Sequence, residues 1–416
     1  MNANQIYSIV NSALSQSRGA AAVSVTDTSD LMSLGNTMFQ EGWQNDFLSA
    51  LTDVIGKTII VNRPYSSRVK GIIKDYFTFG AALRKLDVEP LEAEGDQSWT
   101  WATSSDPDGI GGTNDGYQAG IFIIKKPTVT QSLYVNMSVW DFEVTVPDVQ
   151  LRSAFHSAEE MAAFVDAIMT ALNNSITESV DAVARLVYAT FAAIRIAETF
   201  GTGATQTLAI NLLEDYNTKF ADVLTAPLTA DVALGNTDFI KYATNVINLT
   251  SKRMQDMSLI YNSQGKKRFT PKENQVLTLN SDFVTAYESY LQADTYHNEM
   301  VKLGEYEEVN FWQGSGTAYG DNTDINVLTP AFAIASETAA EHTVSATGVI
   351  GMLTDDRTLG VTVYDRYSAV ERDNLKRIAQ YKEAANIGFY IDRGENGVVF
   401  FIADDDPEVD DDSVET

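Results

Sequence analysis

The apolar and polar positions near the N-terminus predict an arm that leads into a helix and then a strand. Residues 1–43 are small, polar and weakly patterned, which favours an extended arm with a short helix near residues 6–14. The apolar side chains that follow recur at helical spacing up to Gly56, a residue type that ends helices. The β-branched run at 58–61 then predicts a buried strand, which ends before Pro64.

Residues 67–138 are predicted to form a long two-stranded excursion. Its first limb covers residues 76–88, and its second limb covers residues 120–135 and is rich in Ile, Val, Thr, Phe and Tyr. Between the limbs, Gly, Asp, Ser and Asn dominate, together with Trp99 and Trp101, and such a composition is typical of turns. Because polar connections of this length are uncommon in compact domains, we expect this one to be functional or disordered.

Residues 156–200 carry the periodicity of two helices. Ser157 and Glu160 match a capping box at the start of the first helix. The second helix has few charges and an apolar stripe that consists of Val180, Val183, Ala184, Val187, Phe191 and Ile194. Gly201 and Gly203 end this helix. A helix with so few charges is predicted to be buried on most sides.

Residues 205–345 alternate between helical and strand patterns. Helices are predicted at 206–224, 238–255 and 281–291. Strands are predicted at 259–261, 276–279, 309–312 and 331–335, and a glycine-rich loop at 313–324. The segment therefore predicts a mixed α/β lobe.

Residues 346–403 return to strand-rich sequence. Candidate strands lie at 349–353, 359–367, 387–392 and 397–402, and the charged segment 369–385 is compatible with a helix. Asp and Glu dominate residues 404–416, which predicts a disordered, solvated tail. Taken together, the elements predict an α+β fold.

The charge balance limits the classes of function. The chain has 29 basic and 57 acidic residues and a formal net charge of −28, so a surface that grips nucleic acid over its whole extent is excluded. Cysteine is absent, which removes disulfides, thiolate nucleophiles and cysteine-based metal sites. The first residues do not resemble a signal peptide, and the apolar run at 186–194 is too short to span a bilayer. We expect a soluble protein that is made in the cytoplasm.

The sequence offers little chemistry for catalysis. His156, His297 and His342 lie far apart and show no metal-binding spacing, so we interpret them as surface or capping residues. The triplet Gly56-Lys57-Thr58 ends like a phosphate-binding loop, but Leu51 stands where the first glycine is needed.

Two further glycine-containing segments have simple explanations. The oxygen-rich segment 106–116 has Ile110 where a calcium loop needs an acid or amide, so a flexible loop tip is favoured. The Gly201-x-Gly203 pair follows a helix and not a strand, which excludes a dinucleotide fingerprint. We therefore predict no catalytic residue, no cofactor and no metal, and a protein that is not an enzyme.

The order of elements resembles the Hong Kong 97-type capsid fold of tailed phages. Several stretches are similar to head proteins of small short-tailed phages, namely Gln44–Phe47 with Leu48–Ile60, Leu151–Phe155 with Glu159–Leu172, Gly351–Val363, Tyr381–Ala385 and Val398–Asp404. The resemblance implies a major capsid protein of a bacteriophage, found in the virion and assembled in the host cytoplasm. It also implies hexamers and pentamers of the same chain, scaffolding and portal proteins as partners, and DNA enclosed without specific binding.

The resemblance divides the chain into named parts. These are an N-terminal arm and short helix (1–56), a P-domain strand (57–66), an E-loop (67–138), a P-domain with a long spine helix (139–204), an A-domain (205–345), P-domain return strands (346–403) and the acidic tail (404–416). An apolar β excursion would be an aggregation hazard on a monomer, whereas a neighbouring copy can cover it. We accordingly assign Trp99 and Trp101 to packing between copies.

Two other interpretations remain open at this point. An encapsulin-like compartment shell shares the same fold. An acidic monomeric enzyme or binding protein with a β-rich insertion belongs to a different class. Particle formation would distinguish a capsid protein from a monomeric enzyme or binding protein. The neighbouring genes would distinguish it from a compartment shell.

Overall fold

A computed structural model of the chain was analysed. It describes residues 83–88, 129–134, 137–147, 158–294, 303–313, 323–334, 338–373, 376 and 378–412, with short stretches among the first 72 residues. The chain forms two compact units, of which one is the segment Ala82–Tyr134 and the other contains the rest. The expected helix near residues 47–55 and the strand at 58–61 lie outside the described residues, whereas residues 10–16 are helical as expected for the arm.

The smaller unit contains an antiparallel two-stranded ribbon. Strand β1 (Leu83–Val88) pairs with β2 (Val129–Tyr134), so that Leu83 lies opposite Tyr134 and Val88 lies opposite Val129. The pairing of the two predicted limbs is therefore confirmed over these residues. Trp99, Trp101 and the oxygen-rich segment 106–116 lie outside the described residues.

One helix, α5 (Ala158–Phe200), replaces the two helices that the sequence predicted. Its 43 residues contain neither Pro nor Gly, so nothing in the backbone interrupts the helix, which is about 65 Å long. The predicted apolar stripe is buried, and so are Ala189 and Ala193. The helix ends at Gly201, where a Cβ atom would lie 2.5 Å from the carbonyl oxygen of Ala197, and Gly203 has a φ of 74°.

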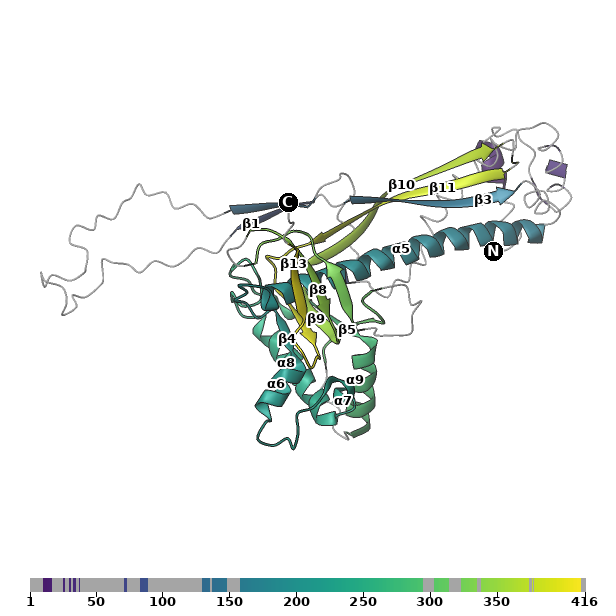
Figure 1. The fold of residues 1–416 in the computed structure, drawn as a ribbon. Helices are drawn as coiled ribbons and strands as arrows, with labels where there is room; N and C mark the ends of the chain where they lie inside the picture. The colour runs from purple at the N-terminus through teal and green to yellow at the C-terminus, as the bar shows by residue number, and fades with distance from the viewer. Residues whose placement is uncertain are drawn as a thin grey trace, which may run out of the picture. The chain divides into compact units, whose positions relative to one another are not determined.

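The core of the larger unit is a five-stranded sheet between two helical layers. Its strand order is β4 (Ala209–Asn211), β12 (Gly397–Phe401), β9 (Val349–Asp355), β5 (Gln275–Asn280) and β6 (Glu307–Val309). Helix α5 covers one face. The other face is covered by α6 (Leu212–Lys219), α8 (Thr237–Arg253) and α9 (Ser281–Asp294). Figure 1 shows this sandwich.

The continuous apolar sequence of β12 follows from its burial on both faces. Val399 and Phe401 pack on the side of α5, whereas Val398, Phe400 and Ile402 pack on the side of α6 and α8. A strand that is covered on both faces loses the alternation of polar and apolar residues.

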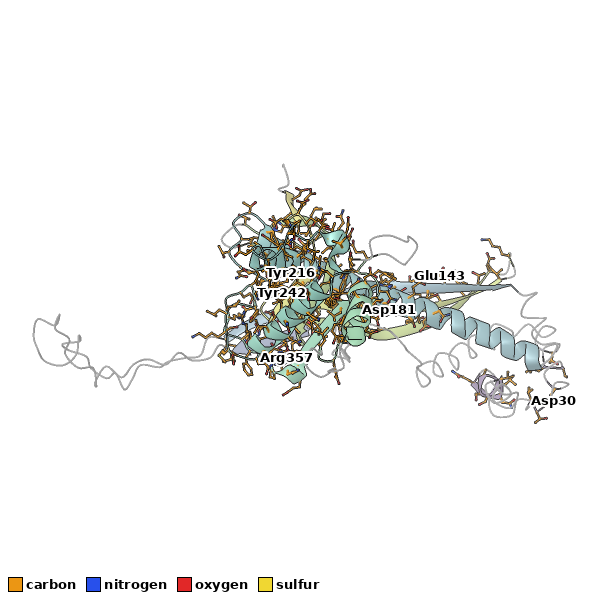
Figure 2. All side chains as sticks on the ribbon, turned by 90° about the horizontal axis from the view of Figure 1, so that it is seen from below. Asp30, Glu143, Asp181, Tyr216, Tyr242 and Arg357 are labelled. Atoms are coloured by element: carbon orange, nitrogen blue, oxygen red, sulfur yellow. The ribbon has the colours of Figure 1, made fainter. Side chains whose placement is uncertain are left out.

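Aromatic side chains join the two outer helices α6 and α8. The ring centroids of Tyr216 and Tyr242 lie 5.5 Å apart. Figure 2 labels both residues. Phe220 and Phe239 complete this aromatic group, because each packs against Tyr216. Edge-to-face contacts of this kind stabilise a helix pair beyond the area that they bury.

A long hairpin runs beside α5 and corrects a second expectation. The charged segment 369–385, for which a helix was considered, is extended and belongs to β10 (Leu359–Asp373) and β11 (Ile378–Ile391). Strand β3 (Met137–Pro147) pairs with β11 and completes a three-stranded antiparallel sheet (Figure 1). Cross-strand ion pairs, such as Lys382 Nζ with Asp141 Oδ2 at 2.7 Å, account for the charges on this sheet.

The acidic C-terminal segment is partly a strand, which corrects the expectation of a wholly disordered tail. Strand β13 (Glu408–Asp412) pairs antiparallel with β8 (Glu341–Ala346), which also pairs with β7 (Ile325–Leu328). Val409 lies opposite Val344 and packs against the core, whereas Glu408 and Asp410 are exposed. The single apolar residue therefore anchors a strand whose other described side chains face solvent.

Other expectations differ in their ends or in their pairing. The predicted helix at 206–224 begins only at Leu212, because residues 209–211 pair with β12 and the side chain of Asn211 caps α6. The strands expected at 259–261 and 331–335 are reduced to single bridges at Ser258–Arg268 and Phe332–Ala340. The strand expected at 309–312 ends at Val309.

The domain boundary expected at residue 345 does not divide the structure. Strands β9 and β12 come from the segment 346–403, yet they pair with β4 and β5 from the segment 205–345. Pairing between distant segments cannot be read from the order of elements alone.

Deletion of residues 404–416 is expected to lower the free energy of unfolding by about 2 kcal/mol. The deletion removes β13 and the packing of Val409, and it exposes one edge of β8. Urea unfolding of the two forms measures the difference. The neutral variant Glu408→Gln keeps the strand and should unfold like the parent chain. Equal stability of the deletion and the parent would show that β13 contributes nothing to the fold.

Candidate functional site

Of the three histidines considered for catalysis, His342 lies in the described part of the structure. His342 is buried in β8, with its Nε2 atom 3.3 Å from the carbonyl oxygen of Phe332, so it is not the surface residue that was expected. His156, His297 and the triplet Gly56-Lys57-Thr58 lie outside the described residues. Across the part of the chain that the structure describes, no three acidic, His or Cys side chains are grouped to hold a metal ion. None of the described helices is both long and apolar enough to cross a membrane.

A buried ion cluster connects α5 with the turn between β11 and β12. Arg195 is fully buried, and its Nη1 atom donates to Glu198 Oε2 at 2.9 Å. Its Nη2 atom donates to the backbone carbonyl of Glu395 at 2.9 Å. Arg393 Nε donates to the other oxygen of Glu198 at 2.7 Å. Burial lowers the pKa of Arg195, and the carboxylate of Glu198 opposes this shift.

A second cluster of polar side chains connects three loops by hydrogen bonds at the same end of the sheet. Thr270 Oγ1 donates to Asp355 Oδ2 at 2.7 Å, and Asn396 Nδ2 donates to Thr270 Oγ1 at 3.2 Å. Burial raises the pKa of Asp355, which hydrogen bonds from Thr270 and from the Arg357 backbone partly offset. These contacts fix the loop before β5 against the turns that flank β9 and β12.

The loop fastened in this way exposes a group of apolar side chains. Residues 252–272, here called the 252–272 loop, include the last residues of α8 and the connection toward β5. Its exposed apolar residues are Met257, Leu259, Ile260 and Phe269. Ser258 and Arg268 exchange two backbone hydrogen bonds of 2.9 Å, and the side chain of Asn262 bonds to both backbone groups of Lys266. The loop therefore has a fixed shape despite its exposure.

The opposite end of β9 opens into an acidic groove. This groove has a volume of about 620 Å³ and is lined by Asp231, Asp404, Asp405, Asp406 and Glu408, with Gly348 at its floor. Gly348 has a φ of 66°, and a Cβ atom there would collide with the carbonyl group of Ile402. The amide of Ala230 donates to Asp404 Oδ1 at 2.9 Å. The groove is therefore built on the ends of β9 and β12.

The ribbon in the smaller unit carries an apolar face of its own. Leu86, Val88 and Val129 are each more than half exposed. Leu86 and Val88 share one face because they are two residues apart, and Val129 lies directly opposite Val88. Exposed apolar groups on a two-stranded ribbon are typical of a surface that another protein covers.

Each of these surfaces has a feature that suits contact with another protein. The ribbon and the 252–272 loop expose apolar side chains, and the groove carries several exposed acidic side chains. Sequence reasoning identified the ribbon but missed the 252–272 loop and the acidic groove. The run Met257–Tyr261 followed by Lys266–Phe269 was available as a signal, but residues 259–261 were predicted only as a strand.

Comparison with known proteins identifies the family. The family model described as the Phi29-like phage major capsid protein matches residues 6–401, nearly the whole chain. No curated protein sequence matches the chain.

Solved structures that resemble the chain include phage capsids. The capsid structure of Staphylococcus phage Andhra shares 9% sequence identity with a TM-score of 0.45, covering 80% of this chain and 83% of that one. The capsid structure of cyanophage P-SCSP1u shares 11% identity with a TM-score of 0.42, covering 83% and 90% respectively.

The family match, and not these distant structures, supports the assignment. It confirms the resemblance to phage head proteins, and neither a compartment shell nor a monomeric enzyme is favoured. The chain belongs to the family of Phi29-like phage major capsid proteins, which are structural proteins of the virion.

Proposed function

We propose that copies of this capsid protein assemble as hexamers and pentamers into an icosahedral head shell that encloses double-stranded DNA. Scaffolding and portal proteins take part in this assembly, which occurs in the cytoplasm of the host bacterium. The family match over residues 6–401 supports the proposal. The net charge of −28 favours an enclosure that does not bind the genome tightly, because like charges repel within about 8 Å at physiological salt.

The parts of a Hong Kong 97-type subunit are assigned to the chain as follows. The ribbon β1–β2 lies in the E-loop, and α5 is the spine helix of the P-domain together with β3, β10 and β11. The A-domain takes the segment 205–345 and, in addition, β9 and β12. Residues 1–56 form the N-terminal arm and 57–66 the first P-domain strand.

The apolar face of the ribbon is the observation that carries the proposal. Leu86, Val88 and Val129 form a continuous apolar row across both strands, and the two-stranded sheet has an edge on each side within the described residues. A free subunit would expose both features to water and to non-native pairing. A shell of identical copies removes this exposure because every ribbon meets a neighbour.

The double variant Leu86→Lys and Val88→Lys is expected to fold normally and to form no closed shells. Both side chains lie in the smaller compact unit and are exposed, so the core of the larger unit is unaffected. Two ammonium groups in a buried interface would each lack a partner, and such charges cost several kcal/mol. Negative-stain microscopy and sedimentation velocity of the co-expressed head proteins measure shell formation.

The control for this experiment is Ser132→Lys, on the opposite face of the ribbon. Ser132 pairs with Lys85, whereas Leu86 pairs with Gln131, so the two positions point to different faces. Shells should form with this variant. Normal shells from the Leu86→Lys and Val88→Lys variant would contradict the proposed role of the ribbon.

A further inference from the structure

We infer that the 252–272 loop of one copy docks into the acidic groove of the next copy, so that subunits join head to tail. The inference rests on the proposed assembly and names the two surfaces that meet within a ring of subunits. It is supported by charge, by apolar exposure and by the positions of both surfaces on the central sheet.

The loop is basic in a chain that is otherwise strongly acidic. Six of the 29 basic residues of the protein fall within these 21 positions, against one acidic residue, Asp256. The basic residues are Lys252, Arg253, Lys266, Lys267, Arg268 and Lys272. Lys252, Arg253, Lys267 and Lys272 are exposed. A basic patch with apolar side chains between the charges fits a partner that is acidic and partly apolar.

The groove has the complementary composition. Asp231, Asp404, Asp405, Asp406 and Glu408 are exposed at its walls. Leu234 and Pro407 are half-buried apolar residues of the same lining, whereas Ile350 and Ile402 lie beneath them in the core. The groove can therefore accept both the charged and the apolar side chains of a loop.

The two surfaces lie at opposite ends of the same strand. Asp355, at the end of β9, accepts a hydrogen bond from Thr270 in the loop, whereas Gly348 lies immediately before β9 and lines the groove. Seven strand residues separate the ends by about 23 Å. The rigid sheet between them fixes the direction of both surfaces.

This placement favours a head-to-tail contact over a twofold contact. A twofold interface built on the loop alone would bring the basic patches of two copies together, and like charges would repel. A heterologous contact brings loop against groove and generates a ring when the rotation closes. The capsomers of a shell are rings of this kind.

Charge reversal at both surfaces tests the contact. The loop variant Lys267→Glu with Lys272→Glu and the groove variant Asp405→Lys with Asp406→Lys should each reduce closed shells about tenfold or more, since opposed like charges weaken association. The combination of all four substitutions restores opposite charges across the contact and should recover shells. Wild-type assembly should weaken as salt rises.

The control variant Lys219→Glu with Lys376→Glu makes the same change in net charge as the loop variant, at positions outside both surfaces. Both of its lysines are exposed, and shells should form. Chemical unfolding of every variant separates lost assembly from lost folding. If the wild-type protein forms no shells, the proposed function fails before this contact is tested.

Three outcomes would overturn the inference while leaving the proposed function intact. The first is normal shells from either charge-reversal pair, and the second is no recovery in the fourfold variant although it folds. In the third outcome, the wild-type protein binds duplex DNA in a salt-sensitive way, and the loop variant loses this affinity but assembles normally. That last result would assign the basic loop to the genome and not to a neighbouring subunit.

Discussion

Replacing Ala189 by glutamate is expected to leave the capsid protein largely unfolded at 37 °C. Ala189 is fully buried on α5, in the core cluster that also contains Phe191 and Val399. A carboxylate placed there would be an unpaired buried charge, which costs several kcal/mol, and its added volume would disturb a packed core. The loss is a large fraction of the 5–15 kcal/mol that stabilises typical domains. Ala193→Glu should have the same effect.

The same helix provides a matched control. Leu186 is 52% exposed, so Leu186→Glu introduces the same charge three residues away without burying it. Urea unfolding followed by circular dichroism should show a large loss for Ala189→Glu and a small change for Leu186→Glu. Similar stability of the two variants would show that both faces of α5 are solvated.

The second large effect is expected for Glu198→Gln. The substitution keeps the size of the side chain but removes the negative charge that contacts both Arg195 and Arg393. Arg195 is fully buried and would lose the acidic side chain to which it donates. Removing one partner of a buried pair costs about 3–5 kcal/mol, since the remaining charge stays away from water.

Glu178→Gln is the control for this prediction, because Glu178 is exposed on the same helix. Its effect on the denaturation midpoint should be within experimental error, whereas Glu198→Gln should lower that midpoint clearly. A small effect of Glu198→Gln would mean that water or the nearby carboxylate of Asp392 compensates the charge of Arg195. The turn between β11 and β12 would then depend on other contacts.

The sequence predicted the central strands well because their burial leaves a strong local signal. The run Val398–Ile402 is apolar at every position, which marks a strand covered on both faces. Helix α8 was predicted to within two residues at each end, and α9 was predicted from its first residue but ends three residues later than expected, since apolar spacing is a local feature. The partners of these strands were not predictable, because pairing depends on segments far apart in the chain.

The wrong predictions of secondary structure share a physical cause. Contacts with distant segments override the conformation that the local sequence pattern favours. The segment 369–385 has enough charge for a surface helix, yet it is extended. Its residues in β11 pair with β10 on one side and with β3 on the other. Strand β13 in the acidic tail has one apolar residue, Val409, and this residue joins a sheet edge. In the 252–272 loop, Leu259 and Ile260 are residue types that are common in core strands, yet both are exposed. The folded structure is needed to show that they lie on the surface.

The position of β12 also determines when the chain can fold. This strand, residues 397–401, lies between β4 and β9 in the central sheet, and its partner in β4 is residues 209–211. A ribosome makes the chain from its N-terminus, so β12 emerges after the other four strands of this sheet. Until then, β4 lacks its partner and the apolar side chains of β9 lack part of their cover. We therefore expect chains that end before β12 to be unable to supply subunits to a growing shell, so that such products of interrupted translation are left out without a separate proofreading step.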